Sequence, residues 1–162
     1  IYGCGQERVV RSSTEKVAGI VGLGQALKEI QDPKNKILHI KTRQMRDRLI
    51  KGILKSISDS RLNGSKIQRL PNNANFSFQG VEGEAMVIAL DQKGIAVSTG
   101  SACSSKSLEP SHVLLALGLS YEEAHGSLRI TLGKYTTQQE IDRFLKVLPS
   151  VIERLRKISG YK

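Results

Sequence analysis

Several residue types are scarce in this 162-residue sequence, and each scarcity narrows the possible fold. There is no tryptophan, and aromatic residues make up only 4% of the chain, so the core must be built from Ile, Leu, Val and Ala. No apolar run approaches the roughly 20 residues that a membrane-spanning helix requires. Nothing at the N-terminal end has the pattern of a secretory signal or a transit peptide. We therefore expect about one domain with an aliphatic core and no membrane segment.

Cysteine is also scarce, because the chain has only Cys4 and Cys103. Two thiols this far apart in the sequence make neither a disulfide framework nor a zinc site. Free thiols in a reducing compartment are the simpler interpretation, and no metal centre is expected.

Acidic residues are outnumbered, with 15 Asp and Glu against 25 Lys and Arg, for a formal charge of +10 and a pI of about 9.8. Such a balance favours acidic partners and can give nonspecific nucleic-acid binding. The basic residues are spread over several segments, without a stripe interleaved with aromatics. A solvated basic surface on part of a larger protein is therefore preferred to a specific nucleic-acid interface.

The hydrophobic pattern alternates between helical and strand-like periods. It predicts helices over 14–31, 34–56, 82–94, 110–117 and 120–127, and from Thr136 onward, with turn chemistry over 58–66. It predicts strands over 66–70, 75–78, 95–99 and 128–132. Thr14 and Thr136 are the expected N-caps of the first and last helices, and Pro149 is expected to kink or split the last helix. The predicted fold is α+β, a small, mostly antiparallel sheet with helices on one face.

The last helix is expected to bury an apolar stripe at helical spacing. That stripe consists of Ile141, Phe144, Leu145, Leu148, Val151, Ile152, Leu155 and Ile158.

Cys103 lies in the segment "STGSACSSKSLEPS", which is rich in serine and glycine. A buried thiol is usually an inert apolar side chain, but the polar neighbours of Cys103 do not fit that role. A thiolate on a polar loop can attack a bound substrate and carry the product away. Lys106, three residues on, would favour the thiolate. Cys4, between two glycines, is interpreted as a small residue in a tight turn.

Arg129 stands in the alternating strand "SLRITLG", where an unpaired guanidinium is expensive to bury. Two explanations remain open: a solvated edge strand, or a bidentate clamp for a carboxylate. His125, four residues earlier, is interpreted as a surface or helix-end residue. The segment "RSST" before the first helix would suit a phosphate, although one such motif is weak evidence.

Together these residues carry a resemblance to a known family. The stretch "GIAVSTGSACSSKSLEPSHVLLALGLSYEEAHGSLRITLGKYTTQQEID" resembles the C-terminal region of the NifS/IscS-type cysteine desulfurases, without a gap. The upstream "GCGQERVVRSSTEKVAGIVGLGQAL" is similar to that family's glycine-rich segment and following helix. "NFSFQGVEGEAMVIALDQKG" lies between the two in the family's order. The long "GSAC" loop with "LEPSHVL" after it is typical of the group with the longer loop.

The resemblance implies a fold-type-I pyridoxal-phosphate transferase that works as a homodimer. Such an enzyme takes sulfur from L-cysteine, releases L-alanine and leaves a persulfide on the loop cysteine. By position, Cys103 resembles that nucleophile, Arg129 the arginine that binds the substrate carboxylate, and Thr14 the threonine that contacts the cofactor phosphate of the other subunit. His125 matches a motif histidine without an assigned role.

The resemblance also implies a domain division. Residues 1–31 would end the large domain with its glycine-rich segment and linking helix, and 32–162 would form the C-terminal small domain with the cysteine loop. The family usually has glycines where this chain has Cys4 and Ser13. Its cofactor lysine lies in a Ser-Gly-His-Lys stretch upstream of the glycine-rich segment, and no such stretch occurs here. We therefore expect a C-terminal piece that is inactive alone.

Further expectations follow from the family. The sulfur acceptor would be an iron–sulfur scaffold protein or a sulfur-relay protein for tRNA thiolation, and the location cytoplasmic or the mitochondrial matrix. Two alternatives remain: a non-enzymatic sulfur-carrier or interaction module that binds an acidic partner, and a related enzyme whose main substrate is selenocysteine.

Overall fold

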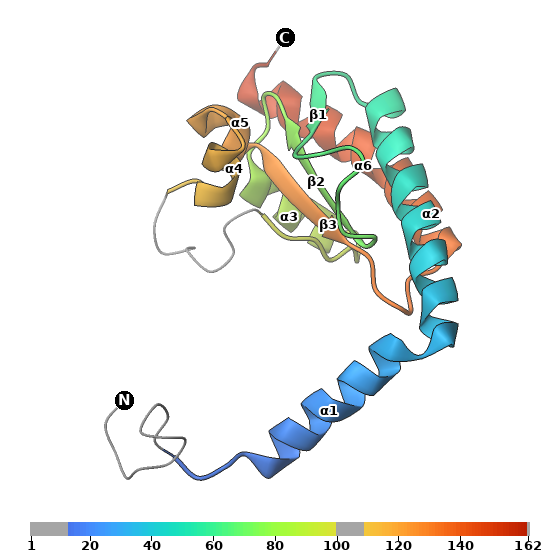
Figure 1. Cartoon of the computed structure of the whole chain (residues 1–162). Coiled ribbons are helices and arrows are strands. Elements are labelled where there is room, and N and C mark those ends of the chain that lie inside the picture. The colour runs from blue at the N-terminus through green and yellow to red at the C-terminus, as the bar shows by residue number, and fades with distance from the viewer. Residues whose placement is uncertain (1–12, 100–108, 162) are drawn as a thin grey trace. The chain divides into compact units, whose positions relative to one another are not determined.

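The computed structural model describes residues 13–99 and 109–161 (Figure 1). The chain divides into two compact units, Ile1–Ile37 and Leu38–Lys162. Cys103, Lys106 and Cys4 lie outside the described residues, so the predictions made for them stay predictions.

The first unit contains helix α1, Val17–Gln31, and the beginning of α2, Pro33–Ser56. Lys16 occupies the N-cap position of α1, so the prediction that Thr14 caps this helix is wrong. The predicted stop at Asp32 is confirmed, because its extended backbone ends α1 and its carboxylate accepts a hydrogen bond from the Lys34 N–H at 2.8 Å.

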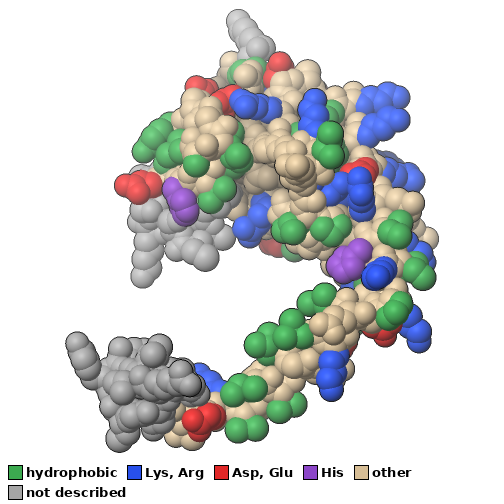
Figure 2. Space-filling view, in the orientation of Figure 1, with side chains coloured by type: hydrophobic (Ala, Val, Ile, Leu, Met, Phe, Trp, Pro, Cys, Tyr) green, Lys and Arg blue, Asp and Glu red, His purple; other side chains and the backbone are tan. Residues whose placement is uncertain are grey.

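Helix α1 buries none of its residues against the described chain. Figure 2 shows apolar side chains along this helix. Its large apolar residues are more than half exposed: Val17, Ile20, Val21, Leu23, Leu27 and Ile30. Most helical stability in proteins comes from packing of an apolar face, and the apolar side chains of α1 are exposed in the structure described.

The second unit is built on a three-stranded antiparallel sheet in the order β1-β2-β3. The strands are β1, Ser60–Leu62; β2, Asn73–Phe78; and β3, Ser127–Thr131. The strands predicted at 75–78 and 128–132 are confirmed as β2 and β3. The strand predicted at 66–70 is wrong, because the Ser65 hydroxyl accepts hydrogen bonds from the N–H groups of Ile67 and Gln68 and turns the chain there.

The other two differences concern the edges of this sheet. Strand β1 lies within 58–66, which was predicted as a turn. The segment 95–99 makes only an isolated bridge, between Ser98 and Arg129.

Besides most of α2, the described residues of the second unit form helices α3, Gly83–Asp91; α4, His112–Ala116; α5, Tyr121–His125; and α6, Gln138–Ser159. Helix α6 begins one residue later than predicted. Thr137, not Thr136, is its N-cap and forms a capping box with Glu140. The predicted split at Pro149 is wrong, because α6 runs unbroken from Gln138 to Ser159. The predicted apolar stripe is buried or half-buried through Leu155, whereas Ile158 is exposed.

Alternate residues divide the sheet into two chemically different faces. One face packs into the core with apolar residues of α2, α3 and α6, and Figure 1 shows α3 and α6 behind the sheet. Its core-facing side chains are Ala74, Phe76, Phe78, Leu128 and Ile130. The opposite face is polar, and its residues are Asn73, Asn75, Ser77, Ser127, Arg129 and Thr131. The predicted α+β class, a small antiparallel sheet covered by helices, is confirmed.

Candidate functional site

Arg129 lies in the middle of β3 on the polar face of the sheet, and its side chain is exposed. The strand is not an open edge at this position. Asn75 of β2 pairs with Arg129 on one side, and Ser98 pairs with it on the other. The guanidinium is therefore presented to solvent from a backbone that is held on both sides.

Ser98 contacts Arg129 through the main chain and the side chain. The Arg129 N–H donates to the Ser98 carbonyl at 2.6 Å, and the Ser98 N–H donates back at 3.2 Å. The Arg129 Nη2 also donates to Ser98 Oγ at 3.3 Å. One edge of the guanidinium is thereby oriented, and no carboxylate of the described residues pairs with it. An oriented, exposed guanidinium can bind a carboxylate from outside this part of the chain.

Beside Arg129, three buried or half-buried polar side chains form a hydrogen-bonded group. Asn63 Nδ2 donates to Asn75 Oδ1 at 2.7 Å and to Ser77 Oγ at 2.9 Å. The sequence prediction missed this group, since Asn63 looked like a turn residue before Gly64. The signal was present in the alternation of "NANFSF", whose asparagines share a strand face with Arg129.

The start of α3 lies close to the same end of the sheet. A β-carbon added to Gly83 would lie 2.6 Å from the Ser127 carbonyl oxygen and 3.1 Å from Thr99 Cγ2. Only glycine allows this approach. His125 ends α5 and is exposed, as its sequence context indicated, and its ring lies 6.4 Å from that of Tyr121.

Thr14 is exposed and precedes α1, in the first unit. Arg129 belongs to the second unit, and each residue is described within its own unit.

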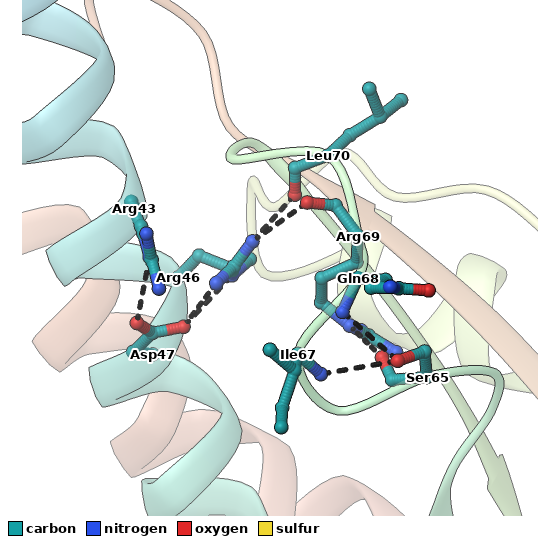
Figure 3. A network of polar contacts seen from close by, with 8 residues as sticks. All are labelled: Arg43, Arg46, Asp47, Ser65, Ile67, Gln68, Arg69 and Leu70. Carbon is teal, nitrogen blue, oxygen red and sulfur yellow. Dashed lines mark hydrogen bonds and ion pairs between the residues drawn. The ribbon is translucent and has the colours of Figure 1, made fainter.

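A basic pocket of about 270 Å³ lies between α2 and the segment before β2, and its arginines are already engaged (Figure 3). Arg46 donates to Asp47 and, at 2.7 Å, to the Leu70 carbonyl. Arg69 donates to the carbonyls of Ser65 and Asn63. Burial and the nearby charge of Arg46 lower the pKa of the Arg69 guanidinium. These arginines brace the segment that leads from β1 to β2.

The other Lys and Arg side chains are dispersed over the surface. Figure 2 shows Lys and Arg side chains at several places on the face in view and not in one stripe. Within residues 13–99 and 109–161, no cluster of His, Cys, Asp and Glu is suited to hold a metal ion. None of the helices in these ranges is long and apolar enough to cross a bilayer.

Residues 5–144 match the family described as aminotransferase class-V. This chain belongs to that family. Within it, the chain is similar to proteins named cysteine desulfurase IscS. It is 52% identical to one from Archaeoglobus fulgidus over 163 residues, covering 98% of this chain and 41% of that protein. It is 51% identical to one from Dictyoglomus turgidum, covering 100% of this chain and 41% of that protein.

Solved structures of related proteins share the fold. A NifS-like protein superposes with a TM-score of 0.77 at 32% identity, covering 95% of this chain and 38% of that one. A NifS-like protein from Rickettsia africae gives a TM-score of 0.76 at 32% identity, covering 94% of this chain and 39% of that one. The chain thus spans about two fifths of the length of its class-V relatives. The resemblance drawn from the sequence is confirmed.

Proposed function

We propose that this chain is the C-terminal part of a cysteine desulfurase, which converts L-cysteine to L-alanine and transfers the sulfur to Cys103. The observation that carries the proposal is the identity of about one half, over nearly the whole chain, to several proteins named cysteine desulfurase. The exposed guanidinium of Arg129, oriented by Ser98 on a polar sheet face, supports it independently.

Three residues have proposed roles. Arg129 binds the α-carboxylate of L-cysteine, because a guanidinium matches a carboxylate with two parallel hydrogen bonds. The hydroxyl of Thr14, exposed before α1, donates a hydrogen bond to the phosphate of the cofactor bound to the partner subunit of a homodimer. Cys103 is the nucleophile that receives the sulfur.

Pyridoxal phosphate is the cofactor of class-V aminotransferases and cysteine desulfurases. The residues described here fit part of its site, with one exposed hydroxyl for the phosphate, and the lysine that would hold it lies outside this sequence. When bound, the cofactor withdraws electrons from the amino acid. Because that lysine is not in this sequence, we expect this chain alone to be inactive. We place the end of the large domain at residues 1–31 and the small domain at 32–162.

The proposed sulfur transfer balances without an added oxidant. The Cys103 thiolate attacks the substrate sulfur, an S–S bond forms, and the C–S bond of the substrate breaks. The carbon receives a proton and becomes the methyl group of alanine, and Cys103 carries the persulfide. A cytoplasmic iron–sulfur scaffold or sulfur-relay protein would then accept the outer sulfur.

The test compares Cys103→Ser with Cys4→Ser in the full-length protein loaded with cofactor. Cys103→Ser is expected to abolish the persulfide, measured by mass spectrometry of the protein incubated with L-cysteine. Cys4→Ser, which removes the other thiol of this sequence, is expected to keep it. Undiminished alanine production and persulfide in Cys103→Ser would refute the proposal.

A further inference from the structure

We propose that Asn75 is a second carboxylate-binding residue beside Arg129, and that Asn63 holds its amide in the binding orientation. The inference rests on the proposed function, which makes Arg129 the carboxylate-binding arginine. It assigns a role to a pair of asparagines that the family resemblance left without one.

The register of the sheet puts Asn75 and Arg129 directly opposite each other. The N–H and C=O of Arg129 bond to Ser98, and the Asn75 carbonyl accepts from the Asn63 N–H at 2.8 Å. The main-chain hydrogen-bonding groups of Arg129 and Asn75 therefore point away from each other. The two residues form a non-hydrogen-bonded pair of the antiparallel ladder. In such pairs the α-carbons are about 4.5 Å apart and the side chains lie closest. The Asn75 amide and the Arg129 guanidinium share one face at neighbouring positions.

Asn63 fixes which end of the Asn75 amide is available. Its Nδ2 donates to Asn75 Oδ1, so the acceptor end is occupied and the two N–H donors of Asn75 Nδ2 remain. Together with the guanidinium, they present N–H donors from two neighbouring positions of this face. A carboxylate, which only accepts, fits such a group, whereas a neutral amide would bring its own N–H donors against it.

This arrangement leaves one buried polar atom of Asn63 without a hydrogen bond. Asn63 is buried, and its Oδ1 is the one buried side-chain acceptor of the described residues without a hydrogen-bond partner. An unsatisfied buried group costs about 1–3 kcal/mol. The same side chain makes two hydrogen bonds through its Nδ2, to Asn75 Oδ1 and to Ser77 Oγ, and the first of these orients the Asn75 amide.

The position of Asn63 is itself braced from α2. Arg69 Nη2 donates to the Asn63 carbonyl at 2.7 Å, and Arg46 holds the adjoining Leu70 carbonyl, as Figure 3 shows for the segment 65–70. A continuous series of hydrogen bonds thus runs from the buried arginine of α2 to the amide beside Arg129. Asn63 acts through Asn75 and is a positioning residue.

The test uses the full-length protein with its cofactor and measures two dissociation constants by calorimetry, for L-alanine and for L-alaninamide. Asn75→Ala is expected to weaken L-alanine binding by about tenfold or more, the loss of one hydrogen bond to a charged group. L-Alaninamide binding is expected to change little. Asn75→Asp, which has nearly the same shape, should weaken L-alanine further because it places two negative groups together.

The matched control is Asn73→Ala, on the same face of the same strand and opposite Thr131. It should leave both constants unchanged. The KM for L-cysteine should rise in Asn75→Ala with kcat nearly unchanged, the signature of lost ground-state binding. Asn63→Ala should show the same pattern to a smaller extent, with its folding checked by circular dichroism.

Equal losses for the acid and the amide, wild-type L-alanine affinity in Asn75→Asp, or no L-alanine binding by the wild type would overturn the inference. Normal desulfurase activity with unchanged carboxylate selectivity in Asn75→Ala defeats this inference alone. Loss of the proposed function would appear differently, as a wild-type protein that forms no persulfide from L-cysteine.

Discussion

Arg46 and Arg48 stand two residues apart on α2 and should differ sharply in what they contribute to stability. Arg46 is 3% exposed and donates to the Leu70 carbonyl at 2.7 Å, whereas the side chain of Arg48 is 55% exposed and pairs with Asp142. The change to make is Arg→Met at each position, because methionine keeps most of the apolar stem and removes the charge.

The expected cost of Arg46→Met is about 2–3 kcal/mol. The hydrogen bond from the guanidinium to Leu70 accounts for most of it, at about 1.5–3 kcal/mol for a charged donor. The pair with Asp47 adds little, because Asp47 is 52% exposed and is solvated when its partner is removed. Arg48→Met removes only an exposed ion pair, which is worth up to about 1 kcal/mol.

Urea unfolding followed by circular dichroism at 222 nm gives both free energies, provided that the slope with urea is unchanged. Methionine at position 46 should lower the midpoint clearly more than methionine at position 48. If the free energies of unfolding of the two variants differ by less than about 0.5 kcal/mol, the difference is no larger than ordinary surface effects. The hydrogen bond from Arg46 to the Leu70 carbonyl then contributes nothing measurable to stability, and the reasoning is wrong.

Two further predictions follow from local geometry. Gly83→Ala should lower the melting temperature, because its β-carbon would meet the Ser127 carbonyl oxygen at 2.6 Å. The control Gly22→Ala should not, because no atom lies within 4 Å of the added β-carbon. Equal effects of the two substitutions would contradict the close approach of α3 to the sheet. The hydrogen bond from the Thr137 N–H is the main cause that lowers the pKa of Glu140, so its charge stabilises the fold above its unfolded pKa of about 4.3 and this contribution is lost as pH falls through the folded value. The difference in melting temperature between the wild type and Glu140→Gln should therefore shrink from pH 7 to pH 3. A difference that grows over this range would contradict the stabilising role of the Glu140 charge.

Helix positions were predictable where sequence signals are local. The Asp32-Pro33 stop and the apolar spacing of α6 act within one or two turns, and both appear in the structure. The split at Pro149 was wrongly predicted, because the packing of α6 in the core outweighs the loss of one N–H donor. Short strands were harder, since Ser60–Leu62 pairs through residues that also suit a turn.

The candidate site was predictable only in part, for the same physical reason. Arg129 was visible as a charge in an apolar strand. Asn75 and Asn63 were not, because their relation depends on register and on a partner 12 residues away in the sequence. Amide side chains are common in loops, and only the sheet reveals that these two meet.

Arg129 has two separate parts in the structure: its main chain pairs with Ser98, and its side chain is exposed. Two main-chain hydrogen bonds tie Ser98 to the sheet, and the exposed Arg129 side chain adds only one longer hydrogen bond to Ser98 Oγ. If Arg129 binds the substrate as proposed, substitutions of its side chain should change substrate selection and leave the two main-chain hydrogen bonds to Ser98 intact. Under the proposed function, carboxylate selectivity and sulfur delivery are in this way open to separate change, by evolution or by engineering.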